Sequence, residues 1–289
     1  MAVLITGCAG FIGSNLAASL KGELYGYDNF STGLVSNLKR VKITLKDSIH
    51  DLKVDRIFHL GIPSSTGLYR NDRHNVTAAV RTTIDVLELA RKNDAKVVYA
   101  SSSSIYNGNP LPYKEDMPIQ VTDFYTEARY YMERLFNLYS QFYGIKSVGL
   151  RMFSVYGKND RGKGKLANVI TQFALDMAAD KQPIIYGDGH QRRDFIHVDD
   201  VAKAYIMAGS YDKTDIFNIG TGVSHSFNEV VELINQALNK SIKPVFITNP
   251  LQNYVGRTEA DVTKAATLLK FRVQIPFEKG VKKYVESLK

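Results

Sequence analysis

The sequence of 289 residues contains one cysteine and no tryptophan. A single cysteine excludes an intrachain disulfide framework and fits a reducing compartment, so we expect a cytoplasmic protein. No apolar run reaches the length of a membrane span, and the amino terminus has the pattern of a core strand rather than of a signal peptide. The six histidines are isolated. No cysteine–histidine cluster has metal-ligand spacing, so we predict no metal site.

The chain is basic, with a net charge of +8 and an isoelectric point near 9.3. A nucleic-acid-binding protein would concentrate such charges in a basic patch, whereas these lysines and arginines are scattered. We therefore expect no nucleic-acid or membrane partner, and interpret the charges as solvated faces with some attraction for an anionic substrate. The hydrophobic content of 44% is that of an ordinary globular protein.

A glycine-rich turn near the amino terminus is the most informative feature. A short aliphatic run ends at Thr6, and Gly7, Gly10 and Gly13 precede a helical pattern over 14–20. Strand, glycine turn and helix together bring backbone N–H groups and a helix N-terminus against a pyrophosphate. The spacing G-x-x-G-x-x-G differs from the commoner G-x-G-x-x-G, so the glycines alone are a weak signal.

The end of the next predicted strand supports a dinucleotide site. Asp28 stands there, about 20 residues after the first glycine, where the dinucleotide fingerprint has an acidic residue. A carboxylate at this point accepts hydrogen bonds from the adenosine ribose and repels a 2′-phosphate, which favours NAD over NADP. The alternative is that Asp28 serves only as a strand-end turn or cap residue.

Short apolar segments alternate with helical patterns along the chain. This alternation predicts an α/β fold, a doubly wound parallel-sheet Rossmann domain with a smaller, interwoven C-terminal substrate lobe. We expect the Rossmann domain to cover residues 1–157, together with a later segment near 190–222 that rejoins it. The lobe is expected mainly over 158–289. Strands are predicted over 42–47, 56–61, 96–102, 147–153, 184–186, 216–220 and 244–247, and helices over 75–93, 123–143 and 165–180.

A candidate catalytic pair lies on the helix predicted over 123–143. Tyr125 and Arg129 are four residues apart and therefore share a helix face. The serines of 101–104 lie at the carboxyl end of the strand over 96–102, where α/β proteins bind ligands. The alternatives are a polar loop for the serines and an ordinary solvated helix residue for Arg129.

These segments together resemble the extended short-chain dehydrogenase/reductase family over nearly the whole chain. Within it the sequence is similar to the nucleotide-sugar epimerases, close to the UDP-glucose (UDP-galactose) 4-epimerases. The motifs that carry the resemblance are TGCAGFIGSN at 6–15, DNFSTG at 28–33, HLG at 59–61, RMFSVYG at 151–157, YGDG at 186–189, RDFIHVDDV at 193–201 and NIGTG at 218–222.

The resemblance implies a reaction and its catalytic residues. Tyr125, as phenolate, would remove the proton of the sugar C4 hydroxyl while a hydride passes from C4 to NAD, and the hydride would return to the other face of the keto sugar. Ser102 is the better-placed hydroxyl to bond the same oxygen, and Ser103 is its competitor. A free tyrosine has a pKa near ~10, which a neighbouring cation such as Arg129 would lower.

The resemblance also implies the binding residues and a homodimer that pairs the helices over 75–93 and 123–143. The helix over 123–143 carries an apolar stripe that could serve the core, the interface or both, formed by Tyr131, Leu135, Leu138 and Phe142. NAD is expected to contact Gly7, Gly10, Phe11, Ile12, Gly13, Asp28, Asn29, Ser31, Thr32, Gly33, Asp47, Ser48, Leu60, Gly61, Tyr125 and Arg129. A nucleotide-diphosphate sugar, a UDP-hexose first of all, is expected to contact Ser64, Ser102, Ser103, Tyr125, Ser154, Lys163, Leu166, Tyr186, Arg193 and Tyr254.

Two positions depart from the family pattern. Arg129 stands where the family has lysine, and its planar fork is larger although the charge is kept. Either Arg129 substitutes for the lysine, or the protein binds NAD and a nucleotide sugar without catalysis. Ser154 stands where many relatives have an asparagine on the substrate diphosphate. A heptose 6-epimerase stays an alternative because 61–66 and Lys163–Gly164 resemble that enzyme, whereas the acidic residues of dehydratases and decarboxylases are missing beside Ser102.

Overall fold

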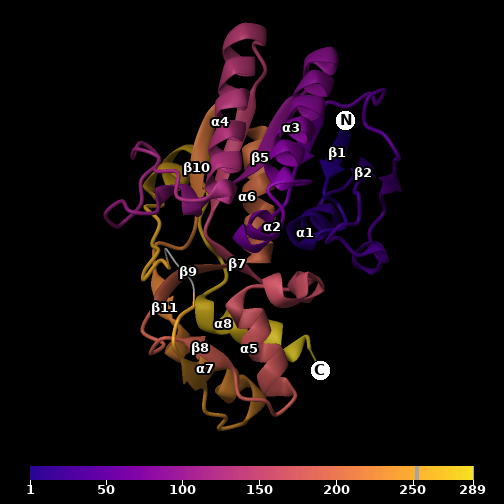
Figure 1. Ribbon diagram of the computed structural model, residues 1–289. Coiled ribbons are helices and arrows are strands. Elements are labelled where there is room, and N and C mark those ends of the chain that lie inside the picture. Colours follow the sequence, from indigo (N-terminus) through magenta and orange to yellow (C-terminus); the bar gives the residue numbers. More distant parts are fainter. Residues whose placement is uncertain (251–253, 289) are drawn as a thin grey trace.

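A parallel sheet forms the centre of the larger part of the protein in the computed structural model, which describes residues 1–250 and 254–288 (Figure 1). Over these residues the sheet has seven strands in the order β10-β6-β5-β4-β1-β2-β3. The order reverses between β1 and β4, and α/β sheets bind ligands beyond the carboxyl ends of the strands at such a point. The strands are β1 (Ala2–Thr6), β2 (Glu23–Tyr27), β3 (Thr44–Leu45), β4 (Arg56–His59), β5 (Lys96–Ser102), β6 (Ser147–Met152) and β10 (Asp215–Ile219).

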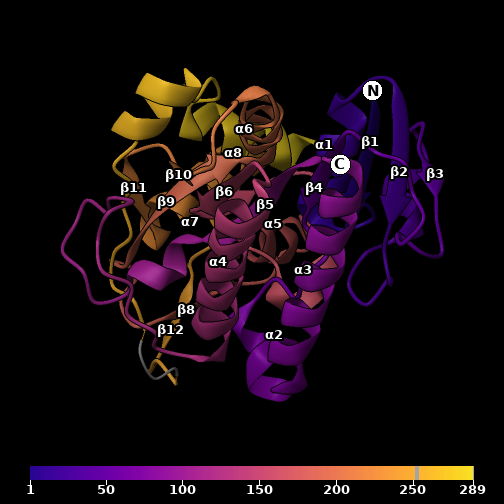
Figure 2. The same cartoon turned by 90° about the horizontal axis from the view of Figure 1, so that it is seen from above.

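Helices cover both faces of this sheet (Figure 2). The side chains of β1 alternate between the faces, so that Val3 and Ile5 lie in one apolar core and Leu4 in the other. Strands buried on both faces need nearly continuous apolar sequence, which these strands have. One face packs against α1 (Phe11–Ser19) and α6 (Val198–Ser210), and the other against α3 (His74–Asn93) and α4 (Phe124–Tyr143), with α2 (Thr66–Asn71) beside them.

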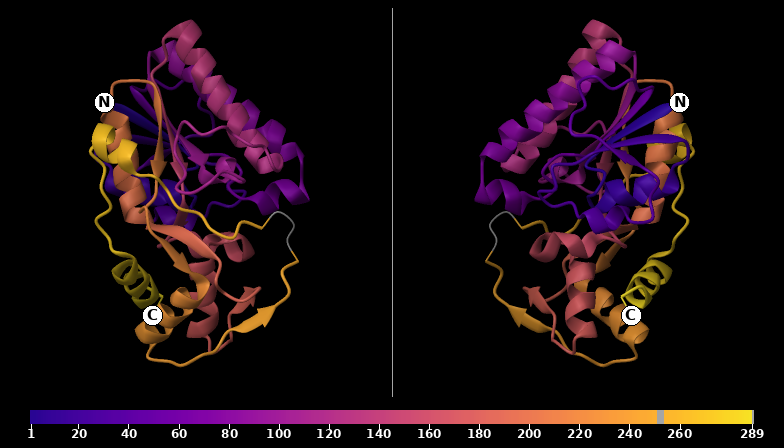
Figure 3. Two further views of the ribbon diagram at one scale, coloured as in Figure 1. Left: turned by 90° about the vertical axis from the view of Figure 1, so that its left-hand side faces the viewer. Right: turned by 90° about the vertical axis from the view of Figure 1, so that its right-hand side faces the viewer.

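The smaller part lies beyond the carboxyl ends of the large sheet (Figure 3). It has its own aromatic core, in which Phe195 stacks on Phe277 with ring centroids 5.5 Å apart. Its helices are α5 (Val169–Ala178), α7 (Phe227–Leu238) and α8 (Phe277–Glu286). Two small sheets accompany them, β11-β9-β7 and β12-β8, made of β7 (Ser154–Tyr156), β8 (Ile184–Tyr186), β9 (Arg192–His197), β11 (Ser224–Ser226) and β12 (Val245–Ile247).

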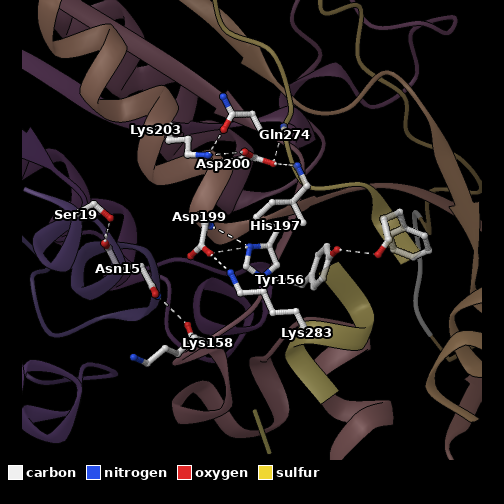
Figure 4. A network of polar contacts seen from close by, with 12 residues as sticks. Asn15, Ser19, Tyr156, Lys158, His197, Asp199, Asp200, Lys203, Gln274 and Lys283 are labelled. Carbon is white, nitrogen blue, oxygen red and sulfur yellow. Dashed lines mark hydrogen bonds and ion pairs between the residues drawn. The ribbon is translucent and has the colours of Figure 1, made fainter. Parts of the chain in front are cut away.

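A polar network connects the C-terminal segment to α6 (Figure 4). Lys283 of α8 donates a hydrogen bond to Oδ2 of Asp199 at 2.6 Å. The next residue, Asp200, is fully buried, and its Oδ2 accepts from the backbone N–H groups of Gln274 and Ile275 at 3.2 and 3.0 Å. The smaller part is therefore joined to a helix of the large sheet by hydrogen bonds as well as by the chain itself.

Local sequence defines both ends of α4. Asp123 and Thr126 form a capping box, in which Oδ1 of Asp123 accepts from the Thr126 N–H at 2.8 Å and the Thr126 hydroxyl accepts from the Asp123 N–H at 3.2 Å. At the other end Gly144 has a φ of +70°, which favours glycine. The helix therefore begins immediately before Tyr125, in register for Tyr125 and Arg129 to face inward.

The predicted α/β fold is confirmed, and so are the helices predicted over 75–93, 123–143 and 165–180, apart from shifted ends. The strand over 42–47 is wrong in length, because only Thr44 and Leu45 pair, at the exposed edge of the sheet. The sequence analysis also missed short strands such as Arg192–His197 and the 3-10 or π turns η1 (Val35–Leu38), η2 (Ser103–Tyr106), η3 (Asp160–Leu166) and η4 (Ala265–Leu269). In the part of the chain that is described, no helix is long and apolar enough to cross a membrane.

We expect Phe195→Ala to lower the free energy of unfolding by about 3–5 kcal/mol, because it removes a fully buried ring that packs on Phe227 and Phe277. Urea unfolding followed by circular dichroism measures the change. Ile184→Ala, in the same part but 54% exposed, is the matched control and should stay within about 0.5 kcal/mol of wild type. A loss below about 1 kcal/mol for Phe195→Ala would contradict the assignment of this core.

Candidate active site

The glycine turn joins β1 to α1 in a conformation that side chains would block. Gly7 has a φ of +69°, in the left-handed region. A Cβ atom at Gly13 would lie 2.0 Å from the carbonyl oxygen of Gly7, so the helix can begin this close to the turn only because Gly13 has no side chain. Gly10 is the N-cap residue of α1. The turn therefore offers backbone N–H groups and a helix N-terminus to an anion.

Asp28 holds the loops on either side of it and also lines the cavity beside the glycine turn. Its Oδ2 accepts from the Ala9 N–H at 2.8 Å, and its Oδ1 accepts from the Phe30 N–H at 2.8 Å. A Cβ atom at Gly33 would lie 2.8 Å from Oδ1 of Asp28, so this approach also requires glycine. The capping role and the place on the cavity wall, weighed as alternatives from the sequence, are both present.

The first cavity, of about 460 Å³, extends from the glycine turn to Tyr125 and Arg129. A smaller cavity of about 100 Å³ adjoins it, with Gly61 and Thr82 in both walls. Asp47 and Ser48 line the smaller cavity. The other residues expected to contact the cofactor line the first one, namely Gly7, Gly10, Phe11, Ile12, Gly13, Asp28, Asn29, Ser31, Thr32, Gly33, Leu60, Gly61, Tyr125 and Arg129.

A second cavity, of about 850 Å³, lies between α2, the start of α4 and the smaller part of the protein. Of the residues expected to contact the substrate, it is lined by Ser102, Ser103, Tyr125, Ser154, Arg193 and Tyr254. Ser64, Lys163 and Leu166 line the first cavity instead. Lys163 pairs with Oδ1 of Asp160 at 2.7 Å and lies 4.9 Å from the ring centroid of Phe11, beside the glycine turn. Tyr186 is not among the described residues that line these three cavities.

The first and second cavities meet at two hydroxyl groups. Among the residues that the structure describes, Ser102, Tyr125, Met152 and Phe153 line both cavities. Ser102 and Tyr125 supply the polar groups at this junction, and both side chains are buried. A molecule in one cavity and a molecule in the other would therefore meet beside a serine hydroxyl and a phenol.

The serines at the end of β5 and in the turn after it have different environments. The Ser101 hydroxyl donates to Oε1 of Glu133 at 2.5 Å. The Ser102 hydroxyl caps the following turn by accepting from the Ser104 N–H at 3.1 Å, and lines both cavities. Ser103 lines only the second cavity. These positions favour Ser102 over Ser103 as the partner of Tyr125.

Arg129 is 3% exposed, so the alternative of a solvated helix residue is wrong. Its Nη1 donates to the carbonyl oxygen of Ala100 at 3.1 Å, and its Nη2 donates to that of Pro63 at 2.8 Å. Its Cζ lies 4.8 Å from the ring centroid of Tyr125. Its Nε is buried and has no hydrogen-bond partner within the described chain. The two carbonyl bonds use two of the five N–H groups of the guanidinium, and Arg129 also forms part of the wall of the first cavity.

His59 lies beneath this site and is completely buried. Thr83 donates its hydroxyl proton to the Ala79 carbonyl at 2.7 Å, so at 3.3 Å it can only accept from Nε2 of His59. Nδ1 of His59 must then accept from the Thr6 hydroxyl at 2.8 Å. Thr6 in turn accepts from the Gly61 N–H at 3.1 Å. Burial, and then the charge of Arg129, lower the pKa of His59 to about 3.

The sequence analysis missed several residues that line the second cavity. Thr66, Arg70 and Arg73 contribute from α2 and the turn after it. Their spacing of four and three residues is a helical pattern that could have marked one face. It also missed the carbonyl groups of Pro63 and Ala100 that receive Arg129, because no side-chain pattern reports a backbone acceptor.

The doubly wound sheet, the glycine turn, the strand-end aspartate and the Tyr125–Arg129 pair define a dinucleotide-dependent enzyme of the short-chain dehydrogenase/reductase class. The chain belongs to the NAD dependent epimerase/dehydratase family, which it matches over residues 3–220, and its cofactor is NAD. The residues of the first cavity fit NAD. The glycines keep the turn open for a pyrophosphate, and the buried Nε of Arg129 lacks an acceptor within the described chain.

Known proteins similar to this chain are nucleotide-sugar enzymes. UDP-glucose 4-epimerase of Mycolicibacterium smegmatis is 31% identical over 308 residues, covering 99% of this chain and 98% of that protein. ADP-L-glycero-D-manno-heptose-6-epimerase of Brachyspira hyodysenteriae is 29% identical, covering 99% and 97%. The structure of Thermotoga maritima UDP-glucose 4-epimerase with UDP-glucose superposes with a TM-score of 0.93 at 28% identity, over 100% and 98% of the chains. These similarities support a nucleotide-sugar epimerase.

We expect acid to destabilise the protein through His59. Its folded pKa lies below the unfolded value of 6.5, so the unfolded chain binds the extra proton. The stabilisation is complete above pH 6.5 and is lost as the pH falls toward 3, by about 1.4 kcal/mol per pH unit. The free energy of unfolding, measured with urea, should fall between pH 7.5 and pH 5.5 in the wild type. The fall should be about 1 kcal/mol smaller in His59→Asn.

The matched control is His50→Asn, at an exposed histidine, which should keep the wild-type pH dependence. An equal loss in His59→Asn and wild type would mean that His59 does not account for the acid sensitivity.

Proposed function

We propose that the protein epimerises the hexose of a nucleotide diphosphate sugar, with UDP-glucose and UDP-galactose the first candidates, by transient oxidation at C4. The observation that carries this proposal is the junction of the two cavities at Ser102 and Tyr125. An epimerase of this type must hold one sugar carbon next to a redox cofactor, with a general base in hydrogen-bond reach of the sugar oxygen.

Each residue at the junction has a task in this proposal. The phenolic oxygen of Tyr125 takes the proton of the C4 hydroxyl and returns it later. The Ser102 hydroxyl, which donates to Oγ of Ser104 at 3.1 Å in the structure, turns its proton to the same sugar oxygen when the substrate binds. NAD, when bound, supplies the reversible two-electron oxidation of the sugar carbon. The apolar side chains of Met152 and Phe153 complete the wall at the junction and limit the access of water.

Arg129 takes the role of the family lysine in a different form. Its charge lies against the face of the Tyr125 ring, with Cζ 4.8 Å from the ring centroid. Its Nη1 and Nη2 atoms each donate one hydrogen to a backbone carbonyl group, and in this proposal the remaining N–H groups of the guanidinium are the donors for a ribose hydroxyl of NAD. The two carbonyl bonds also hold the guanidinium in place, which a lysine ammonium could not reproduce.

The residues of the second cavity fit an anionic nucleotide. Arg193 lies between the rings of Phe227 and Tyr254, with Cζ 5.6 and 5.3 Å from their centroids. In this proposal Arg193 binds the diphosphate, and Ser154 adds a hydrogen bond where many relatives use asparagine. Lys163 and Leu166, beside the glycine turn, would meet the cofactor rather than the sugar.

We further propose that two copies pair through α3 and α4. Their outer surface carries the apolar side chains Ile84, Tyr131, Leu138, Phe142 and Tyr143, all exposed, with Phe142 74% exposed. Leu135 of the predicted stripe packs into the core instead. A second copy of the same helix pair offers an apolar surface of matching kind, as expected for a two-fold interface.

For catalysis we expect Tyr125→Phe to lower turnover of UDP-glucose or UDP-galactose at least about 100-fold, because no other group at the junction can take the proton. NAD affinity, measured by calorimetry, should change little. Arg129→Ala should weaken both turnover and NAD binding, whereas Arg129→Lys, which restores the family residue, should retain part of both. Tyr130→Phe, at the neighbouring tyrosine of the helix, is the matched control and should keep wild-type turnover.

Three other outcomes would contradict this proposal. Turnover of an ADP-heptose but of no UDP-hexose would favour the heptose 6-epimerase alternative. A wild-type protein that is inert on every nucleotide sugar, with an active Arg129→Lys variant, would mean a binding protein whose site has lost catalysis. A Tyr125→Phe variant with wild-type turnover would reject Tyr125 as the base.

For assembly we expect light scattering to give the mass of a dimer for wild type at micromolar concentration and of a monomer for Phe142→Glu, because the charge would be buried at the interface. Phe246→Glu, at an exposed phenylalanine of β12, is the control and should remain dimeric. A monomeric wild type would reject the interface.

A further inference from the structure

Glu133 lies on the same face of α4 as Tyr125 and Arg129, one turn further along the helix. Its side chain is 8% exposed and binds Arg151 of β6 through two bonds, from Nε to Oε1 at 3.0 Å and from Nη2 to Oε2 at 2.7 Å. Oε1 also accepts from the Ser101 hydroxyl of β5 at 2.5 Å. One buried carboxylate thus connects α4 to two strands of the sheet.

Both partners of Glu133 stand next to a residue at the junction of the cavities. Ser101 precedes Ser102, and Arg151 precedes Met152. The strand register pairs Ser101 with Arg151 and Ser102 with Met152. Successive residues of a strand are about 3.3 Å apart, so a displacement of the first pair also moves the second.

Arg151 also holds the turn that follows Ser102. Its Nη1 donates to the Tyr106 hydroxyl at 2.7 Å and to the Glu115 carbonyl at 3.0 Å. The Tyr106 hydroxyl donates to Oδ1 of Asn218 in β10 at 2.8 Å. Since η2 runs from Ser103 to Tyr106, the segment that carries Ser102 is held at both ends by groups bonded to Arg151.

We propose that Glu133 and Arg151 are a positioning pair that sets the distance between the Ser102 and Tyr125 hydroxyls. Neither residue lines the first or second cavity of the described chain, so neither touches a ligand there. A stabilising role alone does not account for the pair, because the desolvation of a buried ion pair offsets most of its attraction. Misplacement of a reacting group by about 1 Å lowers a rate about 100-fold, which makes a rigid connection here valuable.

The kinetic test rests on the proposed function and uses the full chain with NAD. The double variant Glu133→Gln/Arg151→Met removes both charges, so that no unpaired charge stays buried, and glutamine can still accept from Ser101. We expect kcat to fall about 10- to 100-fold, with KM and NAD affinity within about 3-fold of wild type. Arg151→Lys keeps the charge without the planar fork, so its kcat should lie between those of the wild type and the double variant.

The matched control is Asp200→Asn, at another buried carboxylate with backbone partners, on α6 and the opposite face of the sheet (Figure 4). It should lower the unfolding temperature but keep the wild-type kcat. A double variant that is folded, binds NAD and keeps kcat within about 3-fold would overturn the proposal.

Crystal structures of wild type and the double variant provide the second measurement. We expect the distance between Ser102 Oγ and Tyr125 Oη to change by about 1 Å in the variant. An unchanged distance would overturn the proposal. If wild type turned over no nucleotide sugar, the proposed function would fail while this distance would still decide whether the pair positions the two hydroxyls.

Discussion

The site depends on the burial of a permanent positive charge at the end of β5. Arg129 cannot lose its proton, so its guanidinium must find hydrogen bonds wherever it is buried. It finds them at the carbonyl groups of Pro63 and Ala100 and against the ring of Tyr125. These contacts come from three separate segments, the loop after β4, the end of β5 and helix α4. The hydrogen bonds of the Arg129 guanidinium therefore determine how the three segments meet. Because these segments border the cavities, the same bonds also determine where the two cavities join.

A second charged group one turn along α4 repeats this arrangement deeper in the protein. Glu133 binds Arg151 and Ser101, and Arg151 continues to Tyr106 and so to β10. The helix that carries Tyr125 is thus bonded to the sheet through polar groups at Arg129 and Glu133, whereas the neighbouring residues Ala128, Met132 and Phe136 pack in the apolar core. Apolar packing alone tolerates small slips, but directional hydrogen bonds do not. The inner face of α4 combines the two.

Sequence motifs predicted the glycine turn and the strand-end aspartate because both are local features. The glycine turn and Asp28 lie within thirty residues, and their backbone requirements restrict the residue types, as the clash of a Cβ atom at Gly13 with Gly7 illustrates. The second cavity was harder to predict. Ser154, Arg193 and Tyr254 come from distant segments, and Arg70 of α2 and Arg73 of the turn after it, which line the same cavity, belong to no motif. Lys163, expected at the substrate, lies beside the glycine turn because η3 folds back over α1.

By itself the sequence determined the alternation of strands and helices, the glycine turn, the capped start of α4 and the common face of Tyr125 and Arg129, because each follows from spacing and backbone preference over a few residues. Only the tertiary structure decided that Ser102 rather than Ser103 borders both cavities, and that Arg129 is buried against the carbonyl groups of Pro63 and Ala100. It also decided that Leu135 belongs to the core while Phe142 stays exposed. Hydrogen-bond acceptors on the backbone, and neighbours distant along the chain, leave no periodic pattern in the sequence that could report them.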